Sequence, residues 1–318
     1  MSILVTGGAG FIGRWLVKQL LEDGYDVIVL DDFSNGSLEN ISEFKNNPHF
    51  QFIKGDIKDA ELLSNVFNKD LSHCFHLAAD IVVQQSIDDP KKVFENDVTG
   101  TFNILEQCKS HFTKLIFMST CMVYDKAADK DGIDENHPAK PASPYAGAKI
   151  AAENMVLSYY YTYNLPVVIV RPFNTYGPFQ KSDGEGGVVS IFINNYLNKL
   201  SLKIYGTGNQ TRDLLYVEDC AAFLIKAGFN DKANGEIINA GTGADISIND
   251  LAYLISKDKD MIEHIPHIHP QSEIMKLRCD SGKAKKLLDW SPEVSLDEGI
   301  KKTRDWIKTK LEQGEEHE

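Results

Sequence analysis

Short apolar runs alternate along the first half of the chain with stretches whose apolar residues recur at helical spacing. The apolar runs, expected as strands, lie at 3–6, 25–30, 50–57, 74–79, 115–119 and 167–170. The helical stretches between them lie at 14–23, 61–67, 93–109 and 145–163. This alternation predicts an α/β fold of the Rossmann type, a parallel sheet doubly wound by helices, with ligands at the carboxyl ends of its strands.

After Arg171 the pattern loosens, and Pro172, Gly177, Pro178 and the cluster at 184–187 indicate long loops. We therefore expect a dinucleotide-binding domain over 1–172. A smaller α/β domain that binds substrate is expected over 173–312, with some of its chain returning to the first domain. Residues 313–318 form an acidic tail.

The first strand and helix are joined by glycines at 7, 8, 10 and 13, and the second strand ends at Asp31. Glycines at such a junction permit a tight turn, close approach of a pyrophosphate and close helix packing. A carboxylate eighteen residues beyond Gly13 can accept from a ribose 2′-hydroxyl and would repel a 2′-phosphate. The junction therefore predicts NAD rather than NADP; the alternative is a glycine-rich turn without a ligand.

Composition narrows the possible partners and the cellular compartment of the protein. The chain has 318 residues, of which 42% are hydrophobic, and a net charge of −13, which disfavours nucleic acid and membrane surfaces as partners. Five scattered cysteines show no metal-ligand spacing, and we interpret four of them as small buried or half-buried residues of a reducing compartment. No apolar run approaches the length of a transmembrane helix. A cytoplasmic protein without a metal is expected.

The candidate chemistry lies at Tyr145 and Lys149, one helical turn apart, and at the run from Ser119 to Met122. A phenol with a pKa of about 10 is a poor base, and a nearby ammonium favours its charged form. A Ser or Thr hydroxyl can then hold a substrate alcohol while the tyrosine takes its proton. Taken alone, this spacing is weak evidence, because it also occurs on exposed helix faces.

Other polar residues are less decisive. The segment 205–213 is expected to be a turn-rich loop that exposes Gln210 and Arg212, either as a diphosphate clamp or as an ordinary hairpin. Asp80 is either a second acid or base or the cap of the next helix. The histidines 73, 76, 264, 267 and 269 are interpreted as surface or strand residues.

Together these motifs resemble the extended short-chain dehydrogenases/reductases that epimerise or dehydrate nucleotide sugars. The resemblance covers residue 2 to about residue 310 and rests on 6–13, 31–32, 55–57, 76–79, Asn96, 119–120, Tyr145 with Lys149, 171–178 and 210–213. It implies a tightly bound NAD. The implied NAD-binding residues are Gly7, Gly10, Phe11, Ile12, Gly13, Asp31, Asp32, Ser34, Asn35, Gly36, Asp56, Ile57, Leu77, Ala78, Ala79, Asn96, Ser119, Tyr145, Lys149 and Pro172.

The same resemblance implies a UDP-sugar as substrate and a homodimer formed by the helices that contain 103–108 and 146–159. Aromatic residues at 159–161 fit such a dimer face, and core packing explains them equally well. The implied substrate-binding residues are Asp80, Gln84, Met122, Asn174, Val188, Tyr205, Gln210, Arg212 and Glu273.

Cys121 and Met122 decide between the reactions of this family. The resemblance implies that 4,6-dehydratases carry Asp-Glu there, and Met122 cannot replace a glutamate base because it has no exchangeable proton. Cys121 can donate a proton, or act as a base if its pKa is depressed. The pair is similar to that of UDP-N-acetylglucosamine (UDP-GlcNAc) 5,6-dehydratases, which oxidise C4, eliminate water across C5–C6 and return the hydride to C4.

The sequence therefore predicts a UDP-GlcNAc 5,6-dehydratase in which Tyr145, Lys149, Ser119, Thr120 and Cys121 are catalytic. One alternative is a UDP-GlcNAc or UDP-glucose 4-epimerase, with Cys121 as a small filler. The other is a protein that senses NAD without catalysis, although a sensor has no need of the Tyr145–Lys149 pair.

Overall fold

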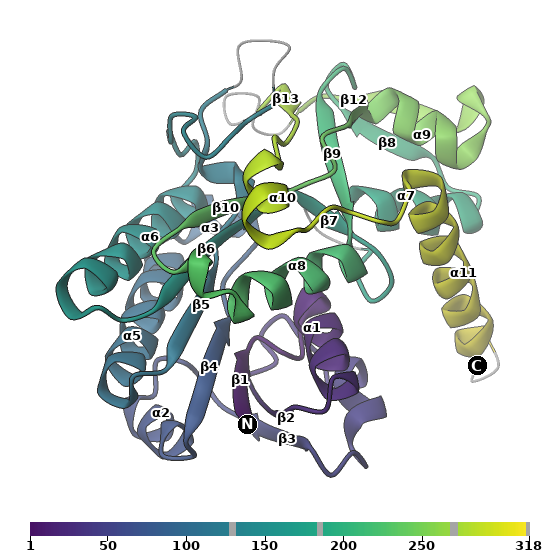
Figure 1. Ribbon diagram of the computed structural model, residues 1–318. Helices are drawn as coiled ribbons and strands as arrows, with labels where there is room; N and C mark the ends of the chain where they lie inside the picture. Colours follow the sequence, from purple (N-terminus) through teal and green to yellow (C-terminus); the bar gives the residue numbers. More distant parts are fainter. Residues whose placement is uncertain (127–131, 183–186, 268–272, 316–318) are drawn as a thin grey trace.

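A twisted parallel sheet forms the centre of the molecule, whose computed structural model describes residues 1–126, 132–182, 187–267 and 273–315 (Figure 1). The strands are β1 Ser2–Thr6, β2 Asp26–Asp31, β3 Phe50–Lys54, β4 Leu71–His76, β5 Lys114–Met118, β6 Val167–Pro172 and β10 Ile237–Ala240. Their order is β10-β6-β5-β4-β1-β2-β3, and every neighbouring pair is parallel. The predicted doubly wound α/β sheet is confirmed.

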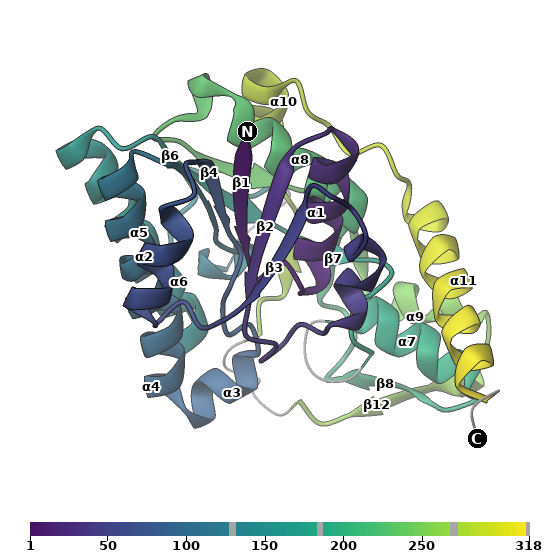
Figure 2. The same cartoon turned by 90° about the horizontal axis from the view of Figure 1, so that it is seen from below.

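Helices cover both faces of this sheet because its strands are apolar on both sides. On one face lie α1 Phe11–Glu22 and α8 Val217–Phe229; on the other lie α2 Ala60–Phe67, α5 Gly100–His111 and α6 Pro144–Tyr163 (Figure 2). The short α3 Val83–Asp88 and α4 Pro90–Val93 lead into a π-helical turn, η2 Phe94–Thr99, that precedes α5. Helix α10 Gly282–Leu288 lies at the β10 edge.

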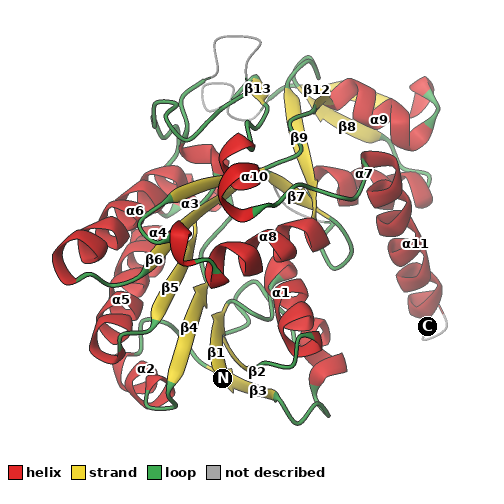
Figure 3. Cartoon of the chain, viewed as in Figure 1, coloured by secondary structure: helices red, strands yellow, loops and turns green. Residues whose placement is uncertain are grey.

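A smaller α/β unit lies beyond the carboxyl ends of the central strands (Figure 3). Its strands are β7 Asn174–Tyr176, β9 Thr211–Tyr216, β11 Asp245–Ser247 and β13 Lys276–Leu277, with β8 Leu202–Tyr205 and β12 Ile262–Ile265 as a separate pair. Its helices are α7 Val188–Leu197, α9 Ile248–Ser256 and α11 Leu296–Glu315. Short 3-10 turns are η1 Glu39–Phe44, η3 Cys121–Val123, η4 Asp231–Ala233 and η5 Lys259–Met261. Apolar side chains of β7, β8, β9, α7, α9 and α11 form a core of their own.

Some expected boundaries were wrong. Strand β4 begins at Leu71 and ends at His76, so residues 77–79 lie in the loop after it. The segment 205–213 is only partly a loop, because residues 211–213 belong to β9, which pairs with β7, β11 and β13. Asp80 does not cap the next helix, whose N-cap is Val82.

The chain order of the strands reverses between β1 and β4, since β1-β2-β3 run to one side and β4-β5-β6 to the other. Loops after β1 and β4 therefore diverge and leave a crevice at this switch point, where doubly wound folds bind ligands. None of the helices in the described segments is long and apolar enough to cross a bilayer.

Candidate active site

The glycine loop after β1 is packed too closely for side chains. Gly7 has a φ of +70°, and a Cβ on it would lie 2.7 Å from the Ala78 amide nitrogen. A Cβ on Gly13 would lie 2.2 Å from the Gly7 carbonyl oxygen. Gly10 is the N-cap of α1, so the free N–H groups and positive dipole end of this helix face the crevice.

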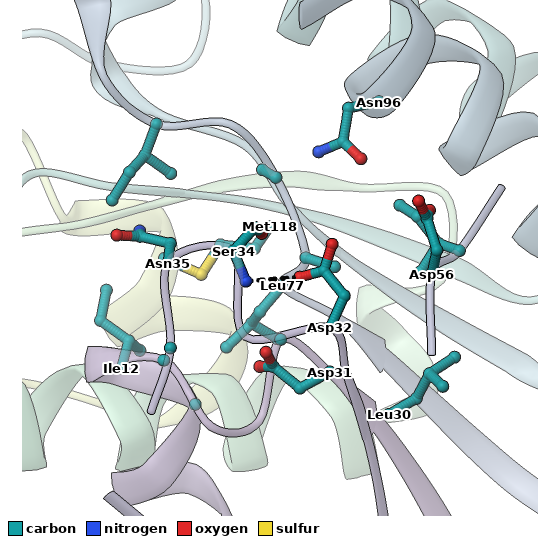
Figure 4. A pocket seen from close by; sticks show the side chains of 18 of the residues that line it. Ile12, Leu30, Asp31, Asp32, Ser34, Asn35, Asp56, Leu77, Asn96 and Met118 are labelled. Atoms are coloured by element: carbon teal, nitrogen blue, oxygen red, sulfur yellow. Dashed lines mark hydrogen bonds between the residues drawn. The ribbon is translucent and has the colours of Figure 1, made fainter. Parts of the chain in front are cut away.

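A cavity opens over this loop, at the ends of β1, β2 and β4 (Figure 4). Of the predicted NAD-binding residues, the structure brings together Gly7, Gly10, Phe11, Ile12, Gly13, Asp31, Asp32, Ser34, Asn35, Gly36, Asp56, Ile57, Leu77, Ala78, Ala79 and Asn96 along its walls. Four lining residues were not predicted: Leu30, Gly55, Ile81 and Met118. Gly55 directly precedes Asp56 at a strand end, a signal that could have been used. Ser119, Tyr145, Lys149 and Pro172 lie outside the lining.

Asp31 is held at the end of β2 by two backbone amides. Its Oδ2 accepts from Ala9 at 3.0 Å and its Oδ1 from Phe33 at 2.8 Å. Burial raises the pKa of Asp31, and these two hydrogen bonds oppose that rise. The neighbouring Asp32 accepts from the Ser34 amide at 2.8 Å, which shapes the loop that closes this end of the cavity (Figure 4).

Tyr145 and Lys149 lie in the first turns of α6, which Ser143 caps by accepting from the Ala146 amide at 3.2 Å. The Lys149 Nζ donates to the Met118 carbonyl at the end of β5, at 3.2 Å, and lies 6.0 Å from the centre of the Tyr145 ring. Both side chains are buried. The bond to β5 aims the lysine at the carboxyl edge of the sheet.

Burial controls the protonation of this pair. It raises the pKa of the Tyr145 phenol, which the Asp97 carboxylate raises further and a hydrogen bond with Thr120 lowers. Burial lowers the pKa of Lys149, and nearby carboxylates, first Asp97, raise it. The resting phenol is therefore protonated, and a positive charge such as that of Lys149 favours the ionised form of a phenol.

Thr120 connects Tyr145 with Cys121. Its backbone is extended just before the turn η3, and its Oγ1 caps that turn by accepting from the Met122 amide at 3.2 Å. Hydrogen bonds with this Thr120 side chain lower the pKa of both the Tyr145 phenol and the Cys121 thiol. Burial nevertheless raises the pKa of Cys121 to about 12, so the thiol is protonated at neutral pH.

Ser119 and the substrate residues of the smaller unit show where the sequence was insufficient. Ser119 Oγ donates to Glu153, which also pairs with Arg171; neither of these two was predicted. Glu153 lies one turn beyond Lys149, a spacing that could have revealed it.

Contrary to prediction, Gln210 is buried and Arg212 is largely buried. Gln210 directly precedes β9, and Arg212 lies within it.

Arg212 nevertheless lies close enough to Cys121 for their charges to interact. Its positive charge acts on the Cys121 thiol, lowering that pKa. Its Nη1 donates to the Ile274 carbonyl at 2.8 Å and its Nη2 pairs with Glu273, which also contacts His267 at 2.5 Å. Gln210 donates to the carbonyl of Tyr205, whose ring packs edge-on against His267. Arg212, Gln210, Tyr205 and Glu273 thus form one cluster.

The other predicted substrate residues are dispersed. Asn174 is in β7, and its Oδ1 is buried without a hydrogen-bond partner in the described part of the chain. Val188 begins α7 and Gln84 lies on α3, where it donates to Asp88 at 2.9 Å. Met122 is half-buried beside Cys121. His269 lies outside the described residues, and no cluster of potential metal ligands occurs within them.

The chain is similar to known proteins over nearly its whole length. Residues 4–303 match the family model described as GDP-mannose 4,6 dehydratase. UDP-glucose 4-epimerase from Mycolicibacterium smegmatis is 36% identical over 313 residues, 98% of this chain and 99% of the relative. The X-ray structure of Pal from Bacillus thuringiensis is 63% identical, with a TM-score of 0.95 over 97% of this chain and 99% of that one. DesIV, the dTDP-glucose 4,6-dehydratase from Streptomyces venezuelae with NAD and TYD bound, is 29% identical, with a TM-score of 0.91 over 98% of each chain.

Proposed function

This chain belongs to the extended short-chain dehydrogenase/reductase family of nucleotide-sugar epimerases and dehydratases, and on that premise we propose that it is an NAD-dependent UDP-GlcNAc 5,6-dehydratase. The proposed reaction oxidises the C4 alcohol, removes water across C5–C6 and restores the C4 alcohol, which leaves UDP-6-deoxy-GlcNAc-5,6-ene. The glycine loop and the held Asp31 carboxylate fit NAD. The glycine loop and Asp31 would hold NAD, which would supply the hydride acceptor for oxidation at C4 and the hydride donor for the later reduction at C4.

The observation that carries the proposal is the pair Cys121 and Met122 beside Tyr145. Neither Cys121 nor Met122 has a carboxylate, so the exchangeable proton at these two positions is that of the Cys121 thiol. The thiol shares the Thr120 hydroxyl with the tyrosine. A protonated thiol beside Tyr145 and Thr120 can give a proton to a departing oxygen, which fits loss of water better than it fits proton abstraction.

Each residue then has a defined task. Tyr145 acts as the phenolate, which the Lys149 ammonium stabilises, and takes the proton of the C4 hydroxyl, while Thr120 donates to the C4 oxygen. Oxidation at C4 acidifies the C5 proton. As that proton leaves, the C6–O bond breaks and Cys121 gives its proton to the departing oxygen, which leaves as water.

Asp80 is the candidate acceptor of the C5 proton. It lies in the loop after β4, and its Oδ2 is buried without a hydrogen-bond partner among the described residues. A proton passed from Asp80 to the Cys121 thiolate restores both groups for the next cycle. The cluster of Arg212, Gln210, Tyr205 and Glu273 is proposed to bind the diphosphate and uridine, with Glu273 giving up its ion pair to the incoming phosphates.

A UDP-sugar 4-epimerase is the second candidate, because the Mycolicibacterium relative bears that activity in its name and Cys121 is small and buried. An epimerase needs no elimination acid. It removes the hydride from one face of C4 and returns it to the opposite face after the keto sugar has turned over, so its product keeps the mass of the substrate.

Incubation with UDP-GlcNAc followed by mass spectrometry separates the two candidates. Loss of one water, with vinyl proton signals in the NMR spectrum, supports the 5,6-dehydratase. An unchanged mass with UDP-GalNAc appearing establishes epimerisation instead. A product with a C6 methyl group and a C4 ketone would identify a 4,6-dehydratase, and dTDP-glucose in a parallel reaction tests the choice of nucleotide.

We also propose that the chain forms a homodimer through α5 and α6. Phe102 on α5 and Tyr161 and Tyr163 on α6 are large exposed apolar residues. Light scattering on the wild type and on Tyr161→Glu would test this: a monomeric variant supports the face, whereas an unchanged dimer excludes it.

A further inference from the structure

A buried aspartate lies behind the catalytic lysine. The Asp97 side chain is fully buried, and its Oδ2 lies 3.9 Å from the Lys149 Nζ, which is itself 4% exposed. This separation is too long for a direct hydrogen bond, so the two groups interact as opposite charges in a site of low dielectric. Within the described chain, Oδ2 accepts no hydrogen bond, and Lys149 is the cation that compensates it.

Asp97 lies in the π-helical turn η2, where separate contacts hold its backbone and its side chain. The Thr101 hydroxyl donates to the Asp97 carbonyl at 2.5 Å and contacts the His76 Nε2 at 3.0 Å, and the His76 Nδ1 contacts Thr6 at 2.7 Å. The Asp97 Oδ1 accepts from the Asp80 amide at 2.8 Å. With the Asp97 backbone carbonyl and Oδ1 held, Oδ2 is the carboxylate oxygen that lies toward Lys149 on α6. Single π-helical turns of this kind frequently occur at functional sites.

A buried lysine needs such a partner to stay charged. Burial alone lowers the pKa of Lys149, and Asp97 is the first of the carboxylates that raise it again. Burial raises the pKa of Asp97 to about 6, with Lys149 opposing the rise. The carboxylate is therefore charged above about pH 6 and neutral below it.

We infer that Asp97 is a positioning residue, which keeps the Lys149 ammonium charged and fixed so that the lysine can assist Tyr145. The inference rests on the proposed oxidation of a sugar hydroxyl by this pair. Asp97 acts through Lys149 and touches neither substrate nor reacting atoms. Its charge also raises the pKa of Tyr145 directly, which has the opposite sign, so replacement of Asp97 measures which effect dominates.

Charged and titratable groups face the Asp97–Lys149 pair from each neighbouring element. Helix α6 carries Tyr145, and Glu153 on the same helix acts on Lys149. The buried His76 lies on β4. Asp80, in the loop after β4, pairs with Lys92 at 3.6 Å, and the uncharged Asn96 of η2 accepts from Lys58 at 3.2 Å. Among these, Lys149 is the cation that acts on Asp97 directly.

The test compares wild type, Asp97→Asn, Lys149→Met and the double variant, using initial rates with UDP-GlcNAc across pH. The wild-type kcat/KM should fall as the pH drops through about 6. Asp97→Asn should be slower at neutral pH by about tenfold and should lack this acidic limb. In the Lys149→Met background the same replacement should cost nothing further. An Asp97→Asn enzyme that keeps the wild-type profile, or is faster at neutral pH, overturns the inference.

A second readout needs no turnover. NMR of enzyme with labelled lysine side chains, with the Lys149 signal assigned from Lys149→Arg, follows the titration of this ammonium. The titration midpoint of Lys149 should move to lower pH in Asp97→Asn. It should stay in place in the control variant Asp219→Asn, because the buried Asp219 accepts from the Glu293 and Val294 amides. An unmoved titration in Asp97→Asn refutes the inference. Wild-type enzyme that turns over no nucleotide sugar refutes the proposed function alone.

Discussion

The Ser119 hydroxyl donates its proton to the Glu153 carboxylate, one turn beyond Lys149 on α6. Glu153 also accepts from the Arg171 Nε at 2.9 Å and Nη2 at 2.5 Å, and all three side chains are buried. The Ser119 proton is thus used in a hydrogen bond within the protein, and toward a substrate Ser119 can only accept a hydrogen bond. Thr120 is the hydroxyl that remains to donate to the substrate.

Replacement of Thr120 should therefore harm catalysis more than replacement of Ser119. We expect Thr120→Ala to lower kcat about 100-fold, because it removes the hydroxyl that contacts Tyr145 and Cys121. Ser119→Ala should cost about tenfold or less, since Arg171 still satisfies Glu153. Steady-state rates of product formation measure both, and Thr120→Ser should restore most of the activity. The opposite ranking would place the substrate hydroxyl against Ser119.

Cys121 should control elimination without controlling oxidation. It is 2% exposed and burial raises its pKa to about 12, so it stays a thiol throughout the assay range and adds no alkaline limb. Cys121→Ala should lower dehydration about 100-fold, whereas Cys121→Ser, which keeps an exchangeable proton, should lower it less. The steps before elimination are oxidation at C4 and removal of the C5 proton. Loss of deuterium from substrate labelled at C5, followed by NMR, measures these two steps. Full dehydration by Cys121→Ala would remove the thiol from the mechanism.

Gly13 should be irreplaceable for cofactor binding. A Cβ there would lie 2.2 Å from the Gly7 carbonyl oxygen, so the loop and α1 must separate in Gly13→Ala. We expect NAD affinity, measured by calorimetry, to fall at least about tenfold. Gly147→Ala on α6 is the matched control, because a Cβ there meets nothing within 4 Å. It should leave NAD affinity unchanged and add about 0.5–1 kcal/mol to the free energy of unfolding.

The sequence predicts the central sheet and the glycine loop because both depend on local patterns. The buried strands are continuous apolar runs, and the residues around Gly7, Asp31, Tyr145 and Lys149 follow motifs of fixed spacing. Strand β9 was missed because its polar start at Thr211 and Arg212 becomes a strand only through pairing with three segments that are distant in the chain. Long-range pairing of this kind leaves no local signal.

Asp97 was missed for a related reason. In the sequence it is one acid in a polar helical stretch, and nothing nearby indicates burial. Only the turn η2, which interrupts the α-helical pattern, and the packing of α6 bring it to Lys149. The same holds for Arg171, whose partner Glu153 lies on another element.

His76 should make stability depend on pH. It is buried between Thr6 and Thr101, and burial, followed by the Lys149 charge, lowers its pKa to about 3. The folded protein therefore keeps this ring neutral, while the unfolded chain binds a proton below about pH 6.5. The contribution of His76 to the free energy of unfolding is complete above that pH, and it falls by about 1.4 kcal/mol for each pH unit below it.

The variant His76→Gln, which can still contact both threonines, isolates this effect. Asp97 acts in the opposite direction, because its raised pKa makes the folded protein bind a proton below about pH 6, so only the difference between variant and wild type is informative. Between pH 7 and pH 5, His76→Gln should lose about 2 kcal/mol less than wild type in urea unfolding. The exposed control His111→Gln should follow wild type. Parallel curves for His76→Gln and wild type would mean that the folded protein admits a proton at His76 despite its burial.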